Sequence, residues 1–185
     1  METTPHWFGP TGMGSKGAGH PIMYGKPKPA VHFVAMPDGG GYPKGFVEWA
    51  YDLMGVTDPE RVLHLCSGSM RTGVRVDLRP EMEPTVVCDC RNTPFEDESF
   101  DWILADPPYS EDYATNLYGT GKNYPKPGQI AKEAARLLRP GGHFGLLHFQ
   151  VPMLRKPMKL QAVYGITTGA GYAIRAWSHA RKVAP

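Results

Sequence analysis

Apolar residues between Lys44 and the end of the chain fall into short runs separated by turn-forming residues. Short aliphatic and β-branched runs are typical of strands, and apolar residues three or four positions apart are typical of helices. These patterns predict strands over 61–65, 73–78, 85–89, 100–105, 143–149, 159–166 and 172–180, and helices over 44–55 and 128–138. The last two strands flank "TTGAG", which predicts an antiparallel hairpin. The order predicts an α/β fold with a mostly parallel, seven-stranded sheet.

The first part of the chain has a different composition. Residues 1–43 are rich in Gly and Pro and show little periodicity, apart from one possible strand over 31–36. We therefore expect an N-terminal arm over 1–43 and a single domain over 44–185, with no separate target-recognition domain. A length of 185 residues suits one domain of this kind.

Composition excludes several classes of protein. No apolar run approaches the length of a membrane span, and the N-terminus lacks the pattern of a signal peptide. The three cysteines do not form a disulfide framework, and no Cys or His set has metal-site spacing. The expectation is a cytoplasmic protein with no metal and no membrane partner.

Charge is distributed unevenly although the net charge is only +2. After Glu133 the chain contains no Asp or Glu, and a one-signed run over a folded segment favours a polyanionic partner such as nucleic acid. A solvated basic face without a ligand is the alternative. The basic residues of this run are Arg136, Arg139, Arg155, Lys156, Lys159, Arg175, Arg181 and Lys182.

Candidate binding residues follow the predicted strands. Ligands of open α/β sheets bind at the carboxyl ends of the strands. The first strand ends in "CSGS", and the next three end in Asp77, Asp89 and Asp106. The glycine turn suits a closely approaching ligand, Asp77 suits a ribose diol, and Asp89 suits an exocyclic amine. The turn lacks the G-x-G-x-x-G pyrophosphate fingerprint, so S-adenosylmethionine fits better than a dinucleotide.

The segment from Pro43 to about Phe149 resembles the class I S-adenosylmethionine-dependent amino-methyltransferases with a D/N/S-P-P-Y/F/W motif. The similar stretches are "YPKGFVEWAYDLMG", "VLHLCSGS", "VDLRP", "DCRNTPFEDESFDWILADPPYS" and "EAARLLRPGGHFGLLH". The resemblance implies a single Rossmann-like class I methyltransferase domain. The cofactor-binding residues that it implies are Pro43, Lys44, Leu65, Cys66, Ser67, Gly68, Asp77, Asp89, Cys90 and Asp106.

The same resemblance makes "DPPY" the catalytic motif. The Asp106 carboxylate and the Pro107 carbonyl would accept hydrogen bonds from a target amine. Pro107 and Pro108 have fixed φ and no N–H, so the turn presents acceptors and holds them still. Tyr109 offers a ring on which a flipped base can stack. Substrate contacts are expected from Ser110, Tyr113 and Lys122 in the loop over 110–127.

One stretch departs from the family pattern. Only "SMRTG" separates Gly68 from Val74, where the family places a full helix. A parallel crossover ordinarily needs about a dozen residues. Either the second strand is misplaced, or the connection is shortened and one face of the sheet lacks its cover.

The leading functional hypothesis is an S-adenosylmethionine-dependent N-methyltransferase that acts on an exocyclic amine of a nucleic-acid base, with adenine N6 of DNA as first choice. An RNA base is the close alternative. A catalytically silent, methyltransferase-like subunit that binds nucleic acid is the hypothesis from another class, and a small-molecule amine methyltransferase is weaker. DNA is favoured over RNA as partner, and a homo-oligomer or a specificity subunit is possible.

Overall fold

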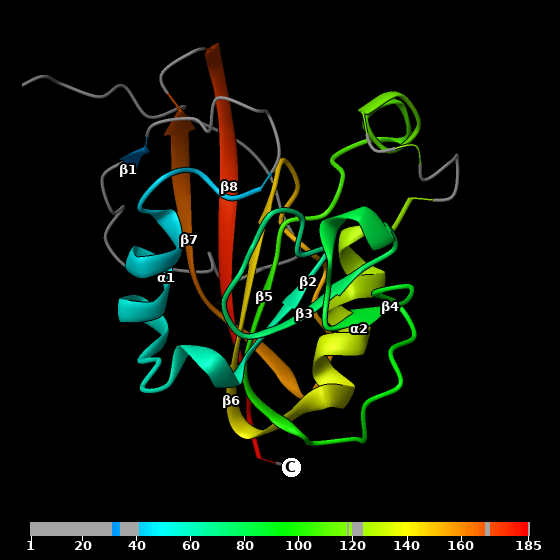
Figure 1. The fold of residues 1–185 in the computed structure, drawn as a ribbon. Coiled ribbons are helices and arrows are strands. Elements are labelled where there is room, and N and C mark those ends of the chain that lie inside the picture. The colour runs from blue at the N-terminus through cyan, green and yellow to red at the C-terminus, as the bar shows by residue number, and fades with distance from the viewer. Residues whose placement is uncertain (1–30, 34–40, 118, 120–123, 169–170, 185) are drawn as a thin grey trace, which may run out of the picture.

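The computed structural model describes residues 31–33, 41–117, 119, 124–168 and 171–184. Eight strands form one sheet in the order β1-β7-β8-β6-β5-β2-β3-β4 (Figure 1). The strands are β1 (Val31–Phe33), β2 (Val62–Leu65), β3 (Val74–Asp77), β4 (Val86–Val87), β5 (Phe100–Ala105), β6 (Leu138–His148), β7 (Met158–Thr168) and β8 (Gly171–Lys182). The seven strands from β2 onward correspond to the seven that the sequence predicts.

The sheet is parallel from β4 to β6, and β8 runs antiparallel to both β6 and β7. Along the chain, β3 and β4 are added to the sheet on one side of β2, and the strands from β5 onward are added on the other side. The point where this winding reverses lies between β2 and β5, and open α/β sheets bind their ligands there. The predicted Rossmann-like fold with an antiparallel C-terminal hairpin is confirmed.

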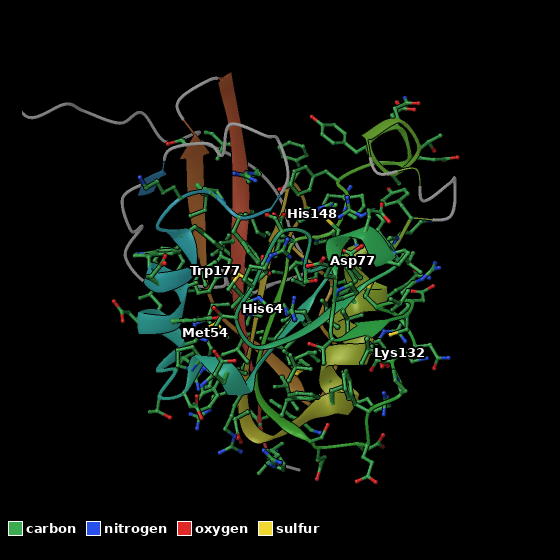
Figure 2. All side chains as sticks on the ribbon, viewed as in Figure 1. Met54, His64, Asp77, Lys132, His148 and Trp177 are labelled. Carbon is green, nitrogen blue, oxygen red and sulfur yellow. The ribbon has the colours of Figure 1, made fainter. Side chains whose placement is uncertain are left out.

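Two helices cover opposite faces of the sheet (Figure 1). On the face covered by α1 (Phe46–Met54), the buried core includes Met54, Leu104 and Trp177. On the face covered by α2 (Pro127–Leu137), it includes Leu63, Ile103 and Phe144. Figure 2 shows Met54 and Trp177 between α1 and the sheet. Consecutive strand residues alternate between the two cores, as a sheet buried on both faces requires.

The shortened connection between β2 and β3 is real, and the second strand lies where the sequence predicts it. Leu63 pairs with Val74 in parallel register, and residues 66–73 contain no helix. Because β2 has only four residues, the return path is roughly 13 Å, and eight extended residues reach roughly 26 Å. A crossover can therefore be shorter than a dozen residues when the strands are this short.

The missing helix leaves one face of β3 and β4 without a helical cover. Val87 is 53% exposed there. Arg75 occupies the same face and donates from Nη1 to the Glu83 carbonyl at 2.8 Å. A polar side chain at Arg75 thus keeps this face from presenting a continuous apolar surface to water.

The C-terminal hairpin extends past the end of β6. β6 pairs with β8 only over Ala176–Arg181, whereas β7 and β8 continue pairing to Gly171 (Figure 1). Residues 171–175 therefore lie beyond the carboxyl ends of the parallel strands. β1 pairs in parallel with the same end of β7, which confirms the predicted strand over 31–33; residues 34–36 lie outside the described residues.

One prediction about a single residue concerns His64 on β2. His64 is a buried core histidine, as expected, and its Nε2 lies 2.8 Å from the Tyr51 hydroxyl. Burial lowers the pKa of His64 to about 4. In the described part of the chain, no helix has the length and apolarity needed to cross a membrane.

Candidate cofactor and methyl-transfer site

A pocket opens at the carboxyl edge of the sheet, around the point where the winding reverses. It encloses about 610 Å³, including the part open to solvent. Its walls include Gly41, Cys66, Gly68, Asp77, Arg79, Asp89, Cys90, Arg91, Asp106 and Pro108. Figure 2 shows Asp77, at the end of β3, and His148, at the end of β6, along this edge of the sheet.

The turn after β2 brings backbone to the pocket wall. Cys66 and Gly68 both have left-handed φ values, of 56° and 52°. The Gly68 N–H donates to the Asp77 carboxylate at 2.9 Å, and the Ser67 N–H donates to the Val76 carbonyl at 2.9 Å. These bonds tie the turn to β3. A Cβ on Gly68 would be in ordinary contact with the backbone of Gly41, at 3.7 Å, so it is the left-handed φ that favours glycine here.

Asp77, at the end of β3, is fully engaged by its neighbours. Its side chain is only 6% exposed. Besides the Gly68 N–H, it accepts hydrogen bonds from the Arg79 backbone N–H at 3.0 Å, from Nε at 3.0 Å and from Nη2 at 3.2 Å. A carboxylate offers about four acceptor positions, so a ligand hydroxyl would replace one of these bonds.

Asp89, after β4, repeats the arrangement. It accepts from the Arg91 backbone N–H at 2.9 Å, from Nε at 2.9 Å and from Nη2 at 2.6 Å. The side-chain hydrogen bonds from Arg91 lower the pKa of Asp89. The arginine partners were not predicted, although the repeated spacing in "DLR" and "DCR" was a local signal for them.

The thiols of Cys66 and Cys90 also line the pocket. The Sγ atoms of Cys66 and Cys90 are 3.3 Å apart. The hydrogen bond with Cys90 and burial raise the pKa of the Cys66 thiol well above its ordinary value. Within the described residues, no group of His, Cys, Asp and Glu side chains has the geometry to hold a metal ion.

Asp106, at the end of β5, lies in a different environment. Burial raises the pKa of Asp106 to about 6, although the Tyr109 hydrogen bond and the nearby Arg175 charge act in the opposite direction. The Tyr109 hydroxyl donates to Asp106 Oδ1 at 2.7 Å and accepts from Arg175 Nη1 at 2.6 Å. A chain of hydrogen bonds therefore links Asp106 to the C-terminal hairpin.

Aromatic side chains surround Tyr109. The Phe149 ring centroid lies 4.7 Å from that of Tyr109, the His148 centroid 5.4 Å and the Tyr113 centroid 5.8 Å. The Arg175 guanidinium lies 5.8 Å from the Tyr109 centroid. Tyr113 is 41% exposed and Phe149 46% exposed, so these two rings offer stacking surfaces at the mouth of the site.

The remaining predicted residues divide into several environments. Leu65 lies in the core, Ser67 is buried, and Pro43 contributes its carbonyl as an acceptor for the Phe46 N–H at 3.0 Å. Lys44 is exposed. Ser110 Oγ accepts from the Tyr113 N–H at 3.2 Å, while Lys122 lies outside the described residues. Sequence reasoning missed Gly41, Arg79, Arg91, His148, Phe149 and Arg175.

Part of the sequence and the overall fold are similar to those of known methyltransferases. The model of a methyltransferase domain family matches residues 67–146. No curated protein matches the sequence. Three solved structures share the fold. TrmN from Thermus thermophilus is 18% identical, with a TM-score of 0.52 over 74% of this chain and 48% of that one.

The second is a chain from the complex between the Haloferax volcanii Trm112 methyltransferase activator and a methyltransferase (15% identity, TM-score 0.51, 75% and 89% coverage). The third is a SAM-dependent methyltransferase from Methanosarcina mazei (15% identity, TM-score 0.50, 74% and 98% coverage). The chain spans about half the length of TrmN.

The sheet has the Rossmann-like fold of class I methyltransferases, and residues 67–146 within it match a methyltransferase domain family. The cofactor that the matched methyltransferase domain indicates is S-adenosylmethionine. Gly68, Asp77 and Asp89 all line the pocket. The assignment of Asp77 to the ribose and of Asp89 to the adenine amine stays a prediction. Cofactor binding would exchange part of the bonding of these acids to Arg79 and Arg91.

Proposed function

We propose that the protein transfers the methyl group of S-adenosylmethionine to an exocyclic amine of a nucleic-acid base. The observation that carries this proposal is the position of Asp106. Its carboxylate lines the cofactor pocket at the end of β5, next to Pro108, and the Tyr109 hydroxyl is its hydrogen-bond donor. Carboxylate and prolines together give a rigid turn that is rich in acceptors and poor in donors.

This turn supplies what an exocyclic amine needs. The amine is a weak nucleophile because its lone pair is delocalised into the ring. An acceptor placed against the amine hydrogens favours a tetrahedral nitrogen, and Asp106 can hold the proton that the nitrogen gives up. The bound cofactor supplies a methyl group on a sulfonium, a good leaving group. The chain's main contributions are then alignment and electrostatics.

The preferred substrate is adenine N6 of DNA, because the aspartate-led motif and the preceding helix most resemble DNA amino-methyltransferases. An RNA base is the alternative. The exposed rings of Tyr113 and Phe149 at the mouth of the site support a base substrate of either kind, because such rings stack on bases.

A second candidate is a catalytically silent subunit that binds nucleic acid. One observation favours it: Asp77 and Asp89 already have arginine partners at their acceptor positions. Calorimetric titration with S-adenosylmethionine separates the two candidates. Measurable binding supports the enzyme, and absence of binding together with retained affinity for nucleic acid supports the silent subunit.

The decisive experiment is transfer of labelled methyl to duplex DNA, single-stranded DNA, RNA and protein, followed by digestion to nucleosides. The proposal predicts label on an N6-methyladenine nucleoside. It also predicts that Asp106→Ala abolishes transfer, while Asp112→Ala, at an exposed acid in the short helical segment that follows, leaves it intact. Label on protein, or equal transfer by Asp106→Ala, would contradict the proposal.

A further inference from the structure

The segment that joins β6 to β7 forms a surface beside the site. Residues 149–157 leave the carboxyl end of β6 at His148 and reach the start of β7 at Met158. β6 and β7 run in the same direction, because each is antiparallel to β8. The segment therefore runs back along the full length of the strands, from the carboxyl end of β6 to the start of β7. It contains no helix or strand.

A groove lies between this segment and α2. Ala131 and Ala135 on the helix and Leu154 on the segment give it apolar walls. Lys132 lines it from α2, and Figure 2 shows this side chain on the side of the helix away from the sheet. Arg155 and Lys156 line it from the segment, so cations stand on both walls.

The charge of this groove is not neutralised locally. No acidic residue lines it, and the side chains of Lys132, Arg155 and Lys156 form no hydrogen bond or ion pair with a described residue. Other basic residues of the acid-free C-terminal run are paired: Arg136 with Glu133, Arg139 with Asp101, and Lys182 with Glu98. The basic run therefore contains both paired and unpaired side chains, and the unpaired Arg155 and Lys156 line the groove together with Lys132 from α2.

Exposed apolar side chains connect the groove to the catalytic turn. Phe149 and Val151 are each 46% exposed, and Met153 is 82% exposed. Phe149 begins this strip beside Tyr109, and Met153 ends it at the wall of the groove. Apolar and aromatic side chains followed by cations are the combination that binds single-stranded nucleic acid, through base stacking and phosphate contacts.

We propose that the strip over 149–153 and the groove beside α2 hold the single strand that flanks the target base. A base stacks on Phe149, a second packs against the apolar side chain of Met153, and phosphates contact Lys132, Arg155 and Lys156. A single strand fits better than a duplex, because stacking requires unpaired base faces. This inference rests on the proposed nucleic-acid substrate and specifies the form that it takes.

The test is fluorescence anisotropy of a labelled 12-nucleotide single-stranded DNA of mixed sequence over a range of salt concentrations. The variant Lys132→Glu/Lys156→Glu is expected to bind at least tenfold more weakly at low salt. The slope of log affinity against log salt should fall by about 1.4, because each lost phosphate contact to a single strand contributes about 0.7. The charge-neutralised pair Lys132→Gln/Lys156→Gln should show the same change in slope with a smaller loss of affinity.

The matched control is Lys159→Glu/Arg181→Glu, which changes net charge equally. Lys159 and Arg181 are register partners on β7 and β8, outside the groove. The control should bind nearly as the wild type does. Equal weakening in both charge-reversal variants, unchanged binding in the groove variants, or equally tight binding of a 12-base-pair duplex would overturn the inference. So would displacement of the oligonucleotide by a poly-glutamate peptide at equal charge concentration.

Methyl transfer and cofactor calorimetry separate this inference from the proposed function. If the wild type methylates nucleic acid and the groove variant does so equally well, the groove inference fails and the proposed function stands. If the groove variant loses oligonucleotide binding while the wild type methylates no nucleic acid, the groove stands and the proposed reaction fails. Circular-dichroism melting confirms that each variant is folded.

Discussion

Three aspartates lie at one edge of this sheet, and they divide into two chemical environments. Asp77 and Asp89, on the cofactor side, are each held by the arginine two positions later in the chain. Asp106, for which the proposed role is catalytic, accepts instead from the hydroxyl of Tyr109. The arginine bonds lower the pKa of Asp89, whereas burial raises that of Asp106 to about 6.

The residue two positions after each acid accounts for the difference in hydrogen-bond donors. Arg79 and Arg91 each donate both a backbone N–H and a guanidinium to the preceding aspartate. The corresponding residue after Asp106 is Pro108, which has neither donor. The same strand-end geometry thus produces two saturated carboxylates and one with acceptor capacity left for a substrate amine.

The largest expected effect comes from removing the charge at Asp106. Asp106→Asn should reduce methyl transfer about 10³-fold, because positioned proton acceptors contribute about 10²–10⁴ to rate. Its affinity for S-adenosylmethionine should change less than about threefold, since Asp106 acts on the amine. Single-turnover transfer and calorimetry measure both quantities. A large loss of cofactor affinity with intact transfer would reverse the assigned roles, and Asp112→Asn is the matched control.

Removing the charge at Asp77 should have the opposite signature. Asp77→Asn is expected to weaken binding of S-adenosylmethionine about 10- to 100-fold, because hydrogen bonds to a charged partner contribute about 1.5–3 kcal/mol. Arg79 would also lose its partner, so the melting temperature should fall. Calorimetry and thermal melting test this, with the exposed Asp52→Asn as control. Unchanged affinity would place the ribose elsewhere.

The role of Pro108 can be tested by giving the turn a donor. Pro108→Ala restores a backbone N–H two residues after Asp106, the position from which Arg79 and Arg91 donate to their acids. The pKa of Asp106 should then fall below about 6, and transfer should slow by about tenfold because the carboxylate is a weaker acceptor. The pH profile of the rate reports both changes. An unchanged profile would rule out this explanation, and exposed Pro94→Ala is the control.

The smallest expected effect is a shift of the pH profile on substitution of Arg175. Only ionised Asp106 accepts the amine proton, so the transfer rate should rise with pH through the Asp106 pKa of about 6. The Arg175 charge favours the ionised form, and Arg175→Gln should therefore move the inflection to higher pH. The rates should converge above about pH 8. A shift to lower pH would contradict this role, and Arg181→Gln on the same strand should cause none.

Local patterns predicted most of the sheet and the three acids. A strand end in an α/β sheet fixes where the next side chain lies, so the order of the strands was enough to place Asp77, Asp89 and Asp106 at one edge. The missing helix between β2 and β3 was visible too, because chain length alone limits what 69–73 can form.

Contacts between distant segments could not be predicted. Arg175 lies 66 residues from Tyr109 in the sequence. The two side chains meet only because β8 extends beyond the end of β6. The groove beside α2 depends on the path of a segment that has no periodic pattern. The residues assigned to cofactor and substrate, and the domain boundary at Pro43, stay predictions.

The contrast between the acids is tested most directly by a carbon-13 NMR titration of the aspartate carboxyl carbons in the ligand-free protein. Resonances are assigned from Asp106→Asn and Asp89→Asn. The account predicts that the Asp106 carboxyl titrates at about 6 and the Asp89 carboxyl below its ordinary value. An Asp106 resonance that titrates together with, or below, that of Asp89 would contradict it.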